Sequence, residues 1–251
     1  MPAESGETLW LAVAFLLVAL VYASVGQAGA SGYIAAMGLL GMAPLTMKTT
    51  ALTLNLLVAG IGTFQFWRLG HLSWRTIYPF AVLGFPFSLL GGAIQLPTGI
   101  YYPVVGIVLL LSAAQMFRSA RKHNASRAAS VVPPPFIPAL FTGALIGFVS
   151  GTTGTGGGVF LAPVVLTMNW ATARQTAATT AVYNLMNSGA ALAGAYAYWD
   201  HIPPAIPVWL AAVAIGGAAG AFFGGRFLSE TWMRYILALL LLVSGLKLVI
   251  P

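Results

Sequence analysis

Apolar residues fill most of the chain in ten runs, which glycine-rich, basic or proline-containing stretches separate. A transmembrane helix needs about 20 predominantly apolar residues. The runs 32–43 and 157–169 are too short for this, and each follows a glycine-rich break. Each is either a half-helix that completes a broken crossing or a re-entrant hairpin. The pattern predicts an all-α polytopic membrane protein with eight to ten membrane segments, at 8–26, 32–43, 46–66, 76–95, 99–117, 136–150, 157–169, 173–198, 205–225 and 230–249.

The composition supports a membrane location. The chain is 59% hydrophobic and 6% charged, whereas soluble domains carry about 25% charged residues. It contains no cysteine, which excludes thiolate metal sites, and we expect neither a metal nor a cofactor. The net charge of +7 indicates membrane topology rather than nucleic-acid binding, because the basic residues lie at the ends of the apolar runs. The acidic start, with Glu4 and Glu7, is unlike a signal peptide, so 8–26 is predicted to be a membrane helix.

A basic and then proline-rich stretch, RSARKHNASRAASVVPPPF, divides the chain nearly in half. We therefore predict a first transmembrane repeat at 1–117, a cytoplasmic linker at 118–135 and a second transmembrane repeat at 136–251. The two halves are interpreted as homologous because short matches recur in the same order. These matches are NLLVAG with NLMNSG, LLGGAI with FFGGRF, RLGHL with YWDHI, GQAGASG with GTTGTGGG, and Lys48 with Arg174 before a Thr-rich helix start.

The positive-inside rule distinguishes two arrangements of these halves. If the short runs cross the membrane, the second half is inverted, and nine basic residues lie inside with two outside. If the short runs are re-entrant, the halves are parallel and the count is seven against four. The rule favours inverted repeats, with both termini outside. The nine inside residues are then Arg68, Arg75, Arg118, Arg121, Lys122, Arg127, Arg174, Arg226 and Arg234, and the two outside are Lys48 and Lys247.

Two consecutive runs in the second half carry a family resemblance. They are GFVSGTTGTGGGVFLAPVVL and RQTAATTAVYNLMNSGAALAG. Together with the duplicated breaks and the basic linker, they resemble the TauE/SafE family of sulfite exporters over nearly the whole chain. The resemblance implies a carrier of the bacterial inner membrane that exports sulfite, an organosulfonate or a related small sulfur anion. The first half departs from the family's glycine-rich pattern, because GQAGASG contains Gln, Ala and Ser.

The glycine-rich breaks are the candidate substrate site. Non-helical backbone at membrane depth is tolerated only where it is buried in protein or lines a wet cavity. A helix that begins after such a break offers unpaired N–H groups and the positive end of its dipole, which bind anions. Neutral donors suit a carrier, because they can bind the anion and release it again, whereas a buried unpaired charge could trap it. The candidates are Gln27, Gly29 and Ser31 in the first break and Thr152, Thr153, Thr155, Gly156 and Gly157 in the second, which is expected to be a loop over 151–158.

Polar residues beside the breaks each allow two interpretations. Asn55 and Asn184 occupy equivalent positions in apolar runs. They either contact the substrate from both halves or form interhelical hydrogen bonds. Lys48 and Arg174 either draw anions toward the site from the two sides of the membrane or only anchor the topology.

Two histidines and two glycine pairs are the remaining candidates. His71 and His201 lie at the ends of apolar runs. They are either proton-linked gates or interfacial histidines. The pairs Gly91–Gly92 and Gly224–Gly225 are interpreted as sites of close helix packing.

Two other functions remain open from the sequence. A passive anion channel is the alternative to a carrier. The second alternative is an intramembrane serine hydrolase that uses Ser150 and His201. However, GFVSG has one residue more than the GxSG turn of such enzymes, so we expect no enzyme. No Walker motif is present, and no carboxylate lies inside an apolar run. The expected partners are a small anion and the lipid bilayer, without nucleic acid, and the small-residue faces permit a homodimer.

Overall fold

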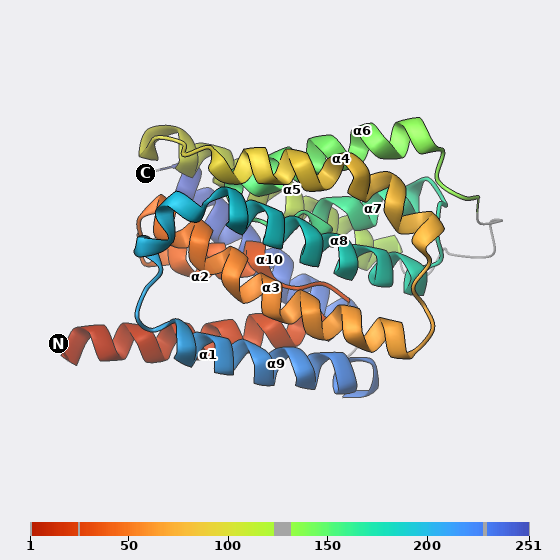
Figure 1. The fold of residues 1–251 in the computed structure, drawn as a ribbon. Helices are drawn as coiled ribbons and strands as arrows, with labels where there is room; N and C mark the ends of the chain where they lie inside the picture. Colours follow the sequence, from red (N-terminus) through yellow and green to blue (C-terminus); the bar gives the residue numbers. More distant parts are fainter. Residues whose placement is uncertain (1, 25, 123–131, 228–229, 251) are drawn as a thin grey trace.

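The computed structural model describes residues 2–24, 26–122, 132–227 and 230–250, and this part of the chain is all helical (Figure 1). Its helices coincide with the ten predicted apolar runs, so the expected all-α architecture is confirmed. The elements are α1 (Pro2–Ser24), α2 (Ala30–Leu39), α3 (Pro44–Arg68), α4 (Trp74–Ala93), α5 (Thr98–Lys122), α6 (Phe136–Thr153), α7 (Gly158–Thr167), α8 (Ala173–Gly194), the 3-10 helix η1 (Tyr196–His201), α9 (Ile206–Phe227) and α10 (Glu230–Val249).

Several helices have the length and composition of membrane spans. In the described residues, five are long and apolar enough to cross a bilayer, within α1, α3, α4, α5 and α6. The predicted short runs are confirmed as the ten-residue helices α2 and α7. Helix α5 continues to Lys122, so the segment expected to be a linker is helical at its start. The rest of that segment includes Arg127, which lies outside the described residues.

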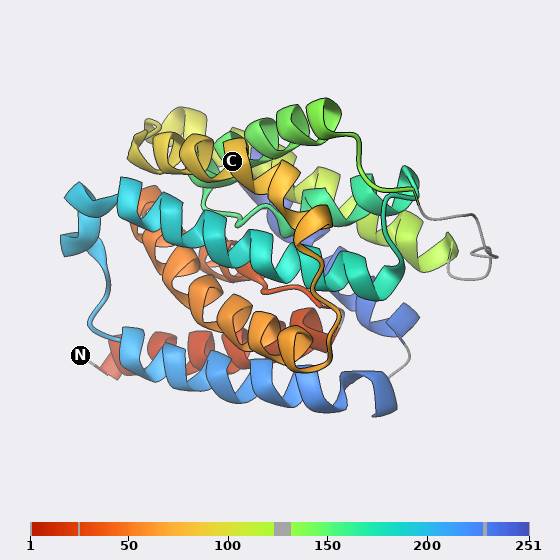
Figure 2. The ribbon, with the colours of Figure 1, turned by 45° about the vertical axis from the view of Figure 1, so that its right-hand side comes forward.

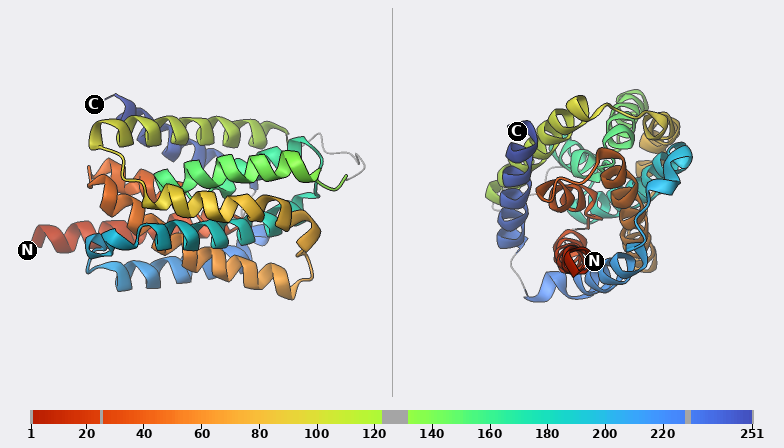
Figure 3. Two further views of the ribbon diagram at one scale, coloured as in Figure 1. Left: turned by 45° about the horizontal axis from the view of Figure 1, so that its top comes forward. Right: turned by 90° about the vertical axis from the view of Figure 1, so that its left-hand side faces the viewer.

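The long helices run roughly along one common axis (Figure 3). Helix α1 begins and α10 finishes at one end of the bundle, here named the termini end. Helix α5 finishes and α6 begins at the opposite end, named the linker end. The short helices lie inside the bundle and point in opposite directions (Figure 2). At the termini end, Lys247 of α10 donates to Leu39 O at the end of α2, while Asn169 O, just after α7, accepts from Val132 N near the linker end.

Glycines bring helices of the two halves into backbone contact. A Cβ at Gly143, Gly147 or Gly151 of α6 would overlap a backbone carbonyl of α4. In the same way, a Cβ at Gly216 or Gly220 of α9 would overlap a carbonyl of α1. Small residues let membrane helices approach this closely. The sequence spacing of four residues therefore produces two tightly packed helix pairs, α4 with α6 and α1 with α9.

The buried apolar side chains form two main clusters, one around each short helix. The larger cluster surrounds α2 and includes Phe15, Tyr33 and Leu54. The second surrounds α7 and includes Phe80 and Leu161. We name α1, α2, α3 and α9 the α2 unit, and α4, α6, α7 and α8 the α7 unit. Each unit thus contains three helices from one half of the chain and the fourth helix of the other half, and α5 packs beside them against α10.

Candidate functional site

The two breaks share a backbone pattern that only glycine adopts easily. Gly26 and Gly29 have φ angles of +76° and +98°, and Gly154 and Gly157 have +84° and +86°. Left-handed backbone of this kind costs other residues free energy because their Cβ atoms crowd the carbonyl oxygen. In each half the second of these glycines immediately precedes the short helix. The breaks are therefore alike in spacing and conformation, with Gln27 in the place that Thr155 takes in the second half.

Asn55 and Asn184 hold the starts of the two short helices. The Oδ1 atom of Asn55 in α3 accepts from Ala30 N at 2.9 Å, and Asn184 Oδ1 in α8 accepts from Gly158 N at 2.8 Å. Neither short helix has a capping side chain of its own, because glycine stands at the N-cap position. Each asparagine supplies the missing acceptor from a neighbouring helix. Both asparagines thus form interhelical hydrogen bonds, and their contact with a substrate stays a prediction.

The two asparagines meet at Gly156 in the centre of the bundle. A Cβ on Gly156 would lie 2.5 Å from Asn55 Nδ2 and 3.1 Å from Asn184 Oδ1. Asn55 Nδ2 donates to Ser188 Oγ at 2.7 Å, which links α3 to α8 at the same depth. Asn55 is 1% exposed and Asn184 is 3% exposed, so the meeting point is enclosed. The structure thus gathers the second break and both asparagines at one buried position.

Of the three candidate threonines, only Thr155 lies in the second break. Helix α6 continues through Thr153, so the expected loop over 151–158 is wrong at its start, and the break covers 154–157. Thr152 Oγ1 donates to Phe148 O at 2.8 Å and Thr153 Oγ1 donates to Val149 O at 2.7 Å. Such bonds to the preceding turn occupy a hydroxyl hydrogen inside its own helix. Thr155 lies in the break itself, 3.0 Å from Thr153 Oγ1.

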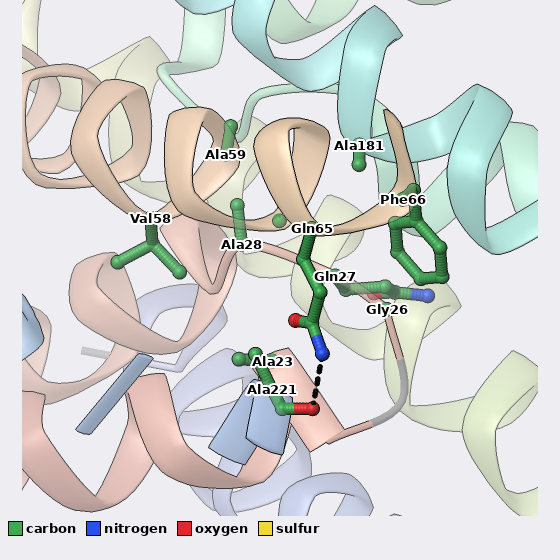
Figure 4. A pocket seen from close by; sticks show the side chains of 11 residues that line it. Ala23, Gly26, Gln27, Ala28, Val58, Ala59, Gln65, Phe66, Ala181 and Ala221 are labelled. Atoms are coloured by element: carbon green, nitrogen blue, oxygen red, sulfur yellow. Dashed lines mark hydrogen bonds between the residues drawn. The ribbon is translucent and has the colours of Figure 1, made fainter. Parts of the chain in front are cut away.

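The first break presents different side chains. Ser31 Oγ lies 2.8 Å from the hydroxyl of Tyr22, and Tyr33 donates to Ala28 O at 2.9 Å. These bonds tie the start of α2 to α1. Gln27 differs, because its buried Oε1 has no hydrogen-bond partner within the described part of the chain. Gln27 lines a small pocket between α1, α3, α8 and α9 (Figure 4).

Lys48 is buried rather than open to arriving anions. Its side chain is 3% exposed. The Nζ atom donates to the carbonyl oxygens of Gly91 at 3.1 Å, Gly92 at 2.8 Å and Ile94 at 2.8 Å. These oxygens lie at the C-terminus of α4, where a cation complements the negative end of the helix dipole. Lys48 therefore joins the α2 unit to the end of α4 and is not exposed at a helix start.

The packing does not place Lys48 and Arg174 at equivalent positions in the two halves. A Cβ on Gly154 would lie 3.0 Å from Lys48 Cα, and a Cβ on Gly26 would lie 2.5 Å from Ala177 Cβ. The first glycine of each break thus packs on a helix of the other half, at Lys48 in α3 and at Ala177 in α8. Arg174 lies three residues earlier, exposed in the first turn of α8.

The remaining sequence candidates lie away from the breaks. His71 follows α3 at the linker end, half-buried, and His201 is exposed in η1 at the other end of the bundle. Ser150 Oγ donates to Gly147 O at 3.1 Å inside α6, so its hydroxyl is not directed to His201. The packing interpretation of Gly91 and Gly92 is confirmed, because a Cβ on either would overlap or press on the backbone of α6 or α8. The same interpretation of Gly224 and Gly225 stays a prediction, because their surroundings lie outside the described part of the chain.

Three buried polar residues near the site were not predicted. Ser188 receives the hydrogen bond from Asn55. Asn187 is 1% exposed, and neither its Nδ2 nor its Oδ1 has a partner within the described residues. Thr50 Oγ1 is also buried without one. The run NLMNSG carries Asn187 and Ser188 directly after Asn184, so a polar residue inside an apolar helix was the available signal.

The electrostatics of the site come from its helix ends and from the buried Lys48, which packs against Gly154. Residues 25–29 and 154–157 include no charged side chain. In the described ranges no group of His, Asp and Glu could hold a metal ion. What the arrangement offers chemically is the N-termini of two helices, amide groups and hydroxyls. These groups are suited to a small anion and provide no acid–base pair for catalysis.

Comparison with known proteins gives consistent similarities. A family model described as "Sulfite exporter TauE/SafE" matches residues 11–248. The chain is 61% identical over 242 residues to a protein of Sinorhizobium fredii described as "Probable membrane transporter protein y4hK", and the match covers 96% of this chain and 98% of the relative. No solved structure matches the chain. Both similarities extend over nearly the whole length, including the two breaks.

Proposed function

We propose a transport function from one premise: the chain belongs to the TauE/SafE family, and it is a membrane transporter, not an enzyme. The proposal is a secondary transporter that exports a small sulfur-containing anion, such as sulfite or an organosulfonate, across the bacterial inner membrane. The anion binds where the two breaks and the two asparagines converge. The family description motivates the substrate class, and the site's chemistry is compatible with it.

One observation carries this proposal. Two short helices begin inside the bundle, and Asn55 and Asn184 hold their first amides at 2.9 Å and 2.8 Å. The amides of a helix's first turn have no partners within the helix and point toward its N-terminus. Two such N-termini near one buried position favour negative charge. The buried Lys48 packs beside Gly154, but its ammonium donates to the end of α4. An anion bound in this way can leave again because neutral N–H groups, rather than an ion pair, hold it.

Inverted repeats are part of the same proposal. The supporting contacts come in related pairs: α1 packs on α9 as α6 packs on α4, and α2 meets α3 as α7 meets α8. The break glycines Gly26 and Gly154 each pack on a helix of the other half. Short helices of opposite direction at the contact of two repeats are a known arrangement of transporter binding sites.

The membrane potential can drive the export. Arg68, Arg75 and Arg174 lie at helix ends on the linker side, so the positive-inside rule assigns that side to the cytoplasm. Moving one negative charge out of a negative interior releases about 2.3 kcal/mol per 100 mV. We therefore propose uniport of the anion, with no coupling ion required.

Purified protein in liposomes tests the proposal. Vesicles loaded with sulfite, sulfate, taurine, sulfoacetate, phosphate or chloride are diluted into anion-free buffer, and efflux is followed with and without an imposed potential. We expect saturable efflux of sulfite or a sulfonate that an interior-negative potential accelerates. The same anions are screened by thermal shift, because a ligand of the native state raises its stability. Unitary currents would establish a channel instead, and no response to any of these anions would reject the anion site.

A further inference from the structure

The small pocket beside the first break lies between the two packing units. On one side it is lined by α1, α3 and α9 of the α2 unit, with Gly62 and Gln65 among the lining residues, and on the other side by Ala181 of α8 (Figure 4). Gln27 and its neighbours in the first break form its inner wall. The pocket therefore lies at the contact of the α2 unit and the α7 unit. We name the position where Asn55, Asn184 and Gly156 meet the central site.

Its position is on the linker side of that site. The lining residues of α3 run from Val58 to Phe66, after Asn55 and toward the helix end at Arg68. The rise of 1.5 Å per residue separates Gly62 from Asn55 by about 10 Å along the axis. On α8 the lining residue Ala181 precedes Asn184, and α8 begins at the linker end. Both helices thus place the pocket between the central site and the linker end.

The contacts that close the linker side differ from those at the termini end. Toward the termini end, the Lys48 ammonium donates three hydrogen bonds across the units to the end of α4. On the linker side, a Cβ at Gly62 would lie 3.7 Å from Ala181 Cβ, an ordinary van der Waals contact. Thr180 Oγ1 lies 3.4 Å from Gly26 O on this side, but its one hydrogen has nearer acceptors within α8, at 2.9 Å and 3.0 Å. The two units can therefore separate on the linker side with less loss of bonding than at the termini end.

Gln27, which lines the pocket, carries an unsatisfied polar atom. Gln65 also lines the pocket, but its Nε2 donates to Ala221 O at 2.7 Å within the α2 unit. The Oε1 atom of Gln27 is buried without a partner within the described part of the chain. A carboxamide offers both an acceptor and two N–H donors. It suits an oxyanion that also carries a donor hydrogen, such as hydrogen sulfite or an aminosulfonate.

We propose that this pocket is the linker-side entrance of the transport path, where Gln27 makes the first contact with the anion and α3 and α8 part at Gly62 and Ala181 to admit it. The proposal rests on the transport function given above. We treat each unit as one body, because glycines hold α9 against α1 in the α2 unit and hold α4 against α6 and α8 in the α7 unit. The termini end stays closed by Lys48 while the linker end opens.

Cysteine cross-linking tests the entrance, and the chain has no native cysteine to interfere. The double variant G62C/A181C places its Cβ atoms 3.7 Å apart across the units, near the mean of about 3.8 Å for disulfides. The matched controls are the single variants G62C and A181C, which carry the same substitutions but cannot form the bond between the units. Each variant is compared oxidised and reduced, so that the substitutions themselves cancel. A maleimide gel shift measures the cross-linked fraction.

The expected result is a selective, reversible block. Oxidised G62C/A181C should lose about tenfold or more of its efflux rate because the gating motion is prevented, and a reductant should restore it. Each single variant should show the same rate under oxidant as under reductant. Efflux from oxidised G62C/A181C at the reduced rate would overturn the entrance, even if the wild type transports. Absence of transport and of anion-dependent stabilisation in the wild type itself would instead reject the proposed function.

Gln27→Leu provides a second, one-sided measurement. Leucine keeps the approximate size of the side chain but removes its donors and acceptor. We expect KM for anion presented from the linker side to rise about tenfold, the scale of one lost hydrogen bond to an ion, with KM from the termini side unchanged. The two orientations are separated with inside-out and right-side-out vesicles. An unchanged KM from the linker side would remove Gln27 from the entrance.

Discussion

The replacement Gly156→Ala tests how closely the two asparagines and the second break depend on one another. Gly156 has φ +77°, and a non-glycine residue in left-handed backbone costs about 1–2 kcal/mol. The new Cβ would also lie 2.5 Å from Asn55 Nδ2, closer than the atoms can approach. Either the break or the asparagine must therefore move.

The contact adds a second cost to the conformational one. If Asn55 retreats, it gives up its hydrogen bonds to Ala30 N at 2.9 Å and to Ser188 Oγ at 2.7 Å. Each is worth about 0.5–1.5 kcal/mol, so the expected loss from this source is about 1–3 kcal/mol. Together with the backbone cost, we expect Gly156→Ala to destabilise the protein by about 2–5 kcal/mol. The efflux rate per folded protein should also fall, because the start of α2 loses its fixed position.

Gly41→Ala is the matched control for the backbone cost alone. Gly41 has φ +68°, and a Cβ there would meet no heavy atom within 4 Å. This variant should show the loss of about 1–2 kcal/mol without a defect in transport. Unfolding is measured in detergent, and sulfite efflux is measured in liposomes at equal protein content. Equal stability losses in the two variants, with efflux preserved in Gly156→Ala, would refute the close contact of the break with Asn55.

Three further outcomes are expected. Lys48→Met should destabilise by about 2–3 kcal/mol, because three carbonyl oxygens lose a charged donor, whereas exposed Arg174→Met should change unfolding by less than about 0.5 kcal/mol; equal effects in denaturation curves would contradict the buried placement of Lys48. Asn184→Asp keeps the acceptor for Gly158 N but adds negative charge beside the site, so anion-dependent thermal stabilisation should weaken about tenfold or more while the protein still folds; undiminished stabilisation would place the anion elsewhere. Gly147→Ala should cost about 1–3 kcal/mol through overlap with α4, whereas Gly99→Ala, where a Cβ meets nothing within 4 Å, should be neutral or stabilising by up to about 1 kcal/mol; a neutral Gly147→Ala would argue against the tight α4–α6 pair.

The positions of the helices follow from local sequence properties. Apolar runs long enough to satisfy their own backbone hydrogen bonds must be helical in a membrane, because lipid offers no partners. This is why all ten predicted runs are helices, and why the runs after the glycine-rich breaks are short. The exact start of the second break escaped prediction because Thr152 and Thr153 bond to the preceding turn and extend α6.

The residues of the candidate site are far apart along the chain, and the sequence predicted only some of them. The breaks and the two asparagines could be selected because polar or flexible residues inside apolar runs need a reason. That Asn55 would hold Ala30, or that both asparagines would meet at Gly156, does not follow from their spacing along the chain. The role of Lys48 was also missed, because its carbonyl partners at Gly91 and Gly92 lie more than forty residues away.

The sequence by itself determined that this is a helical membrane protein with two glycine-rich breaks and a family resemblance that the comparisons confirm. Only the tertiary structure decided which helices form each packing unit, which side chains hold the short helices, and where a pocket opens. The physical reason lies in the solvent. Lipid-facing and protein-facing surfaces of a membrane helix are both apolar, so hydrophobic periodicity does not reveal the buried face. Backbone contacts through glycines such as Gly147 and Gly220 select the partner helices instead, and these contacts exist only once the chain has folded.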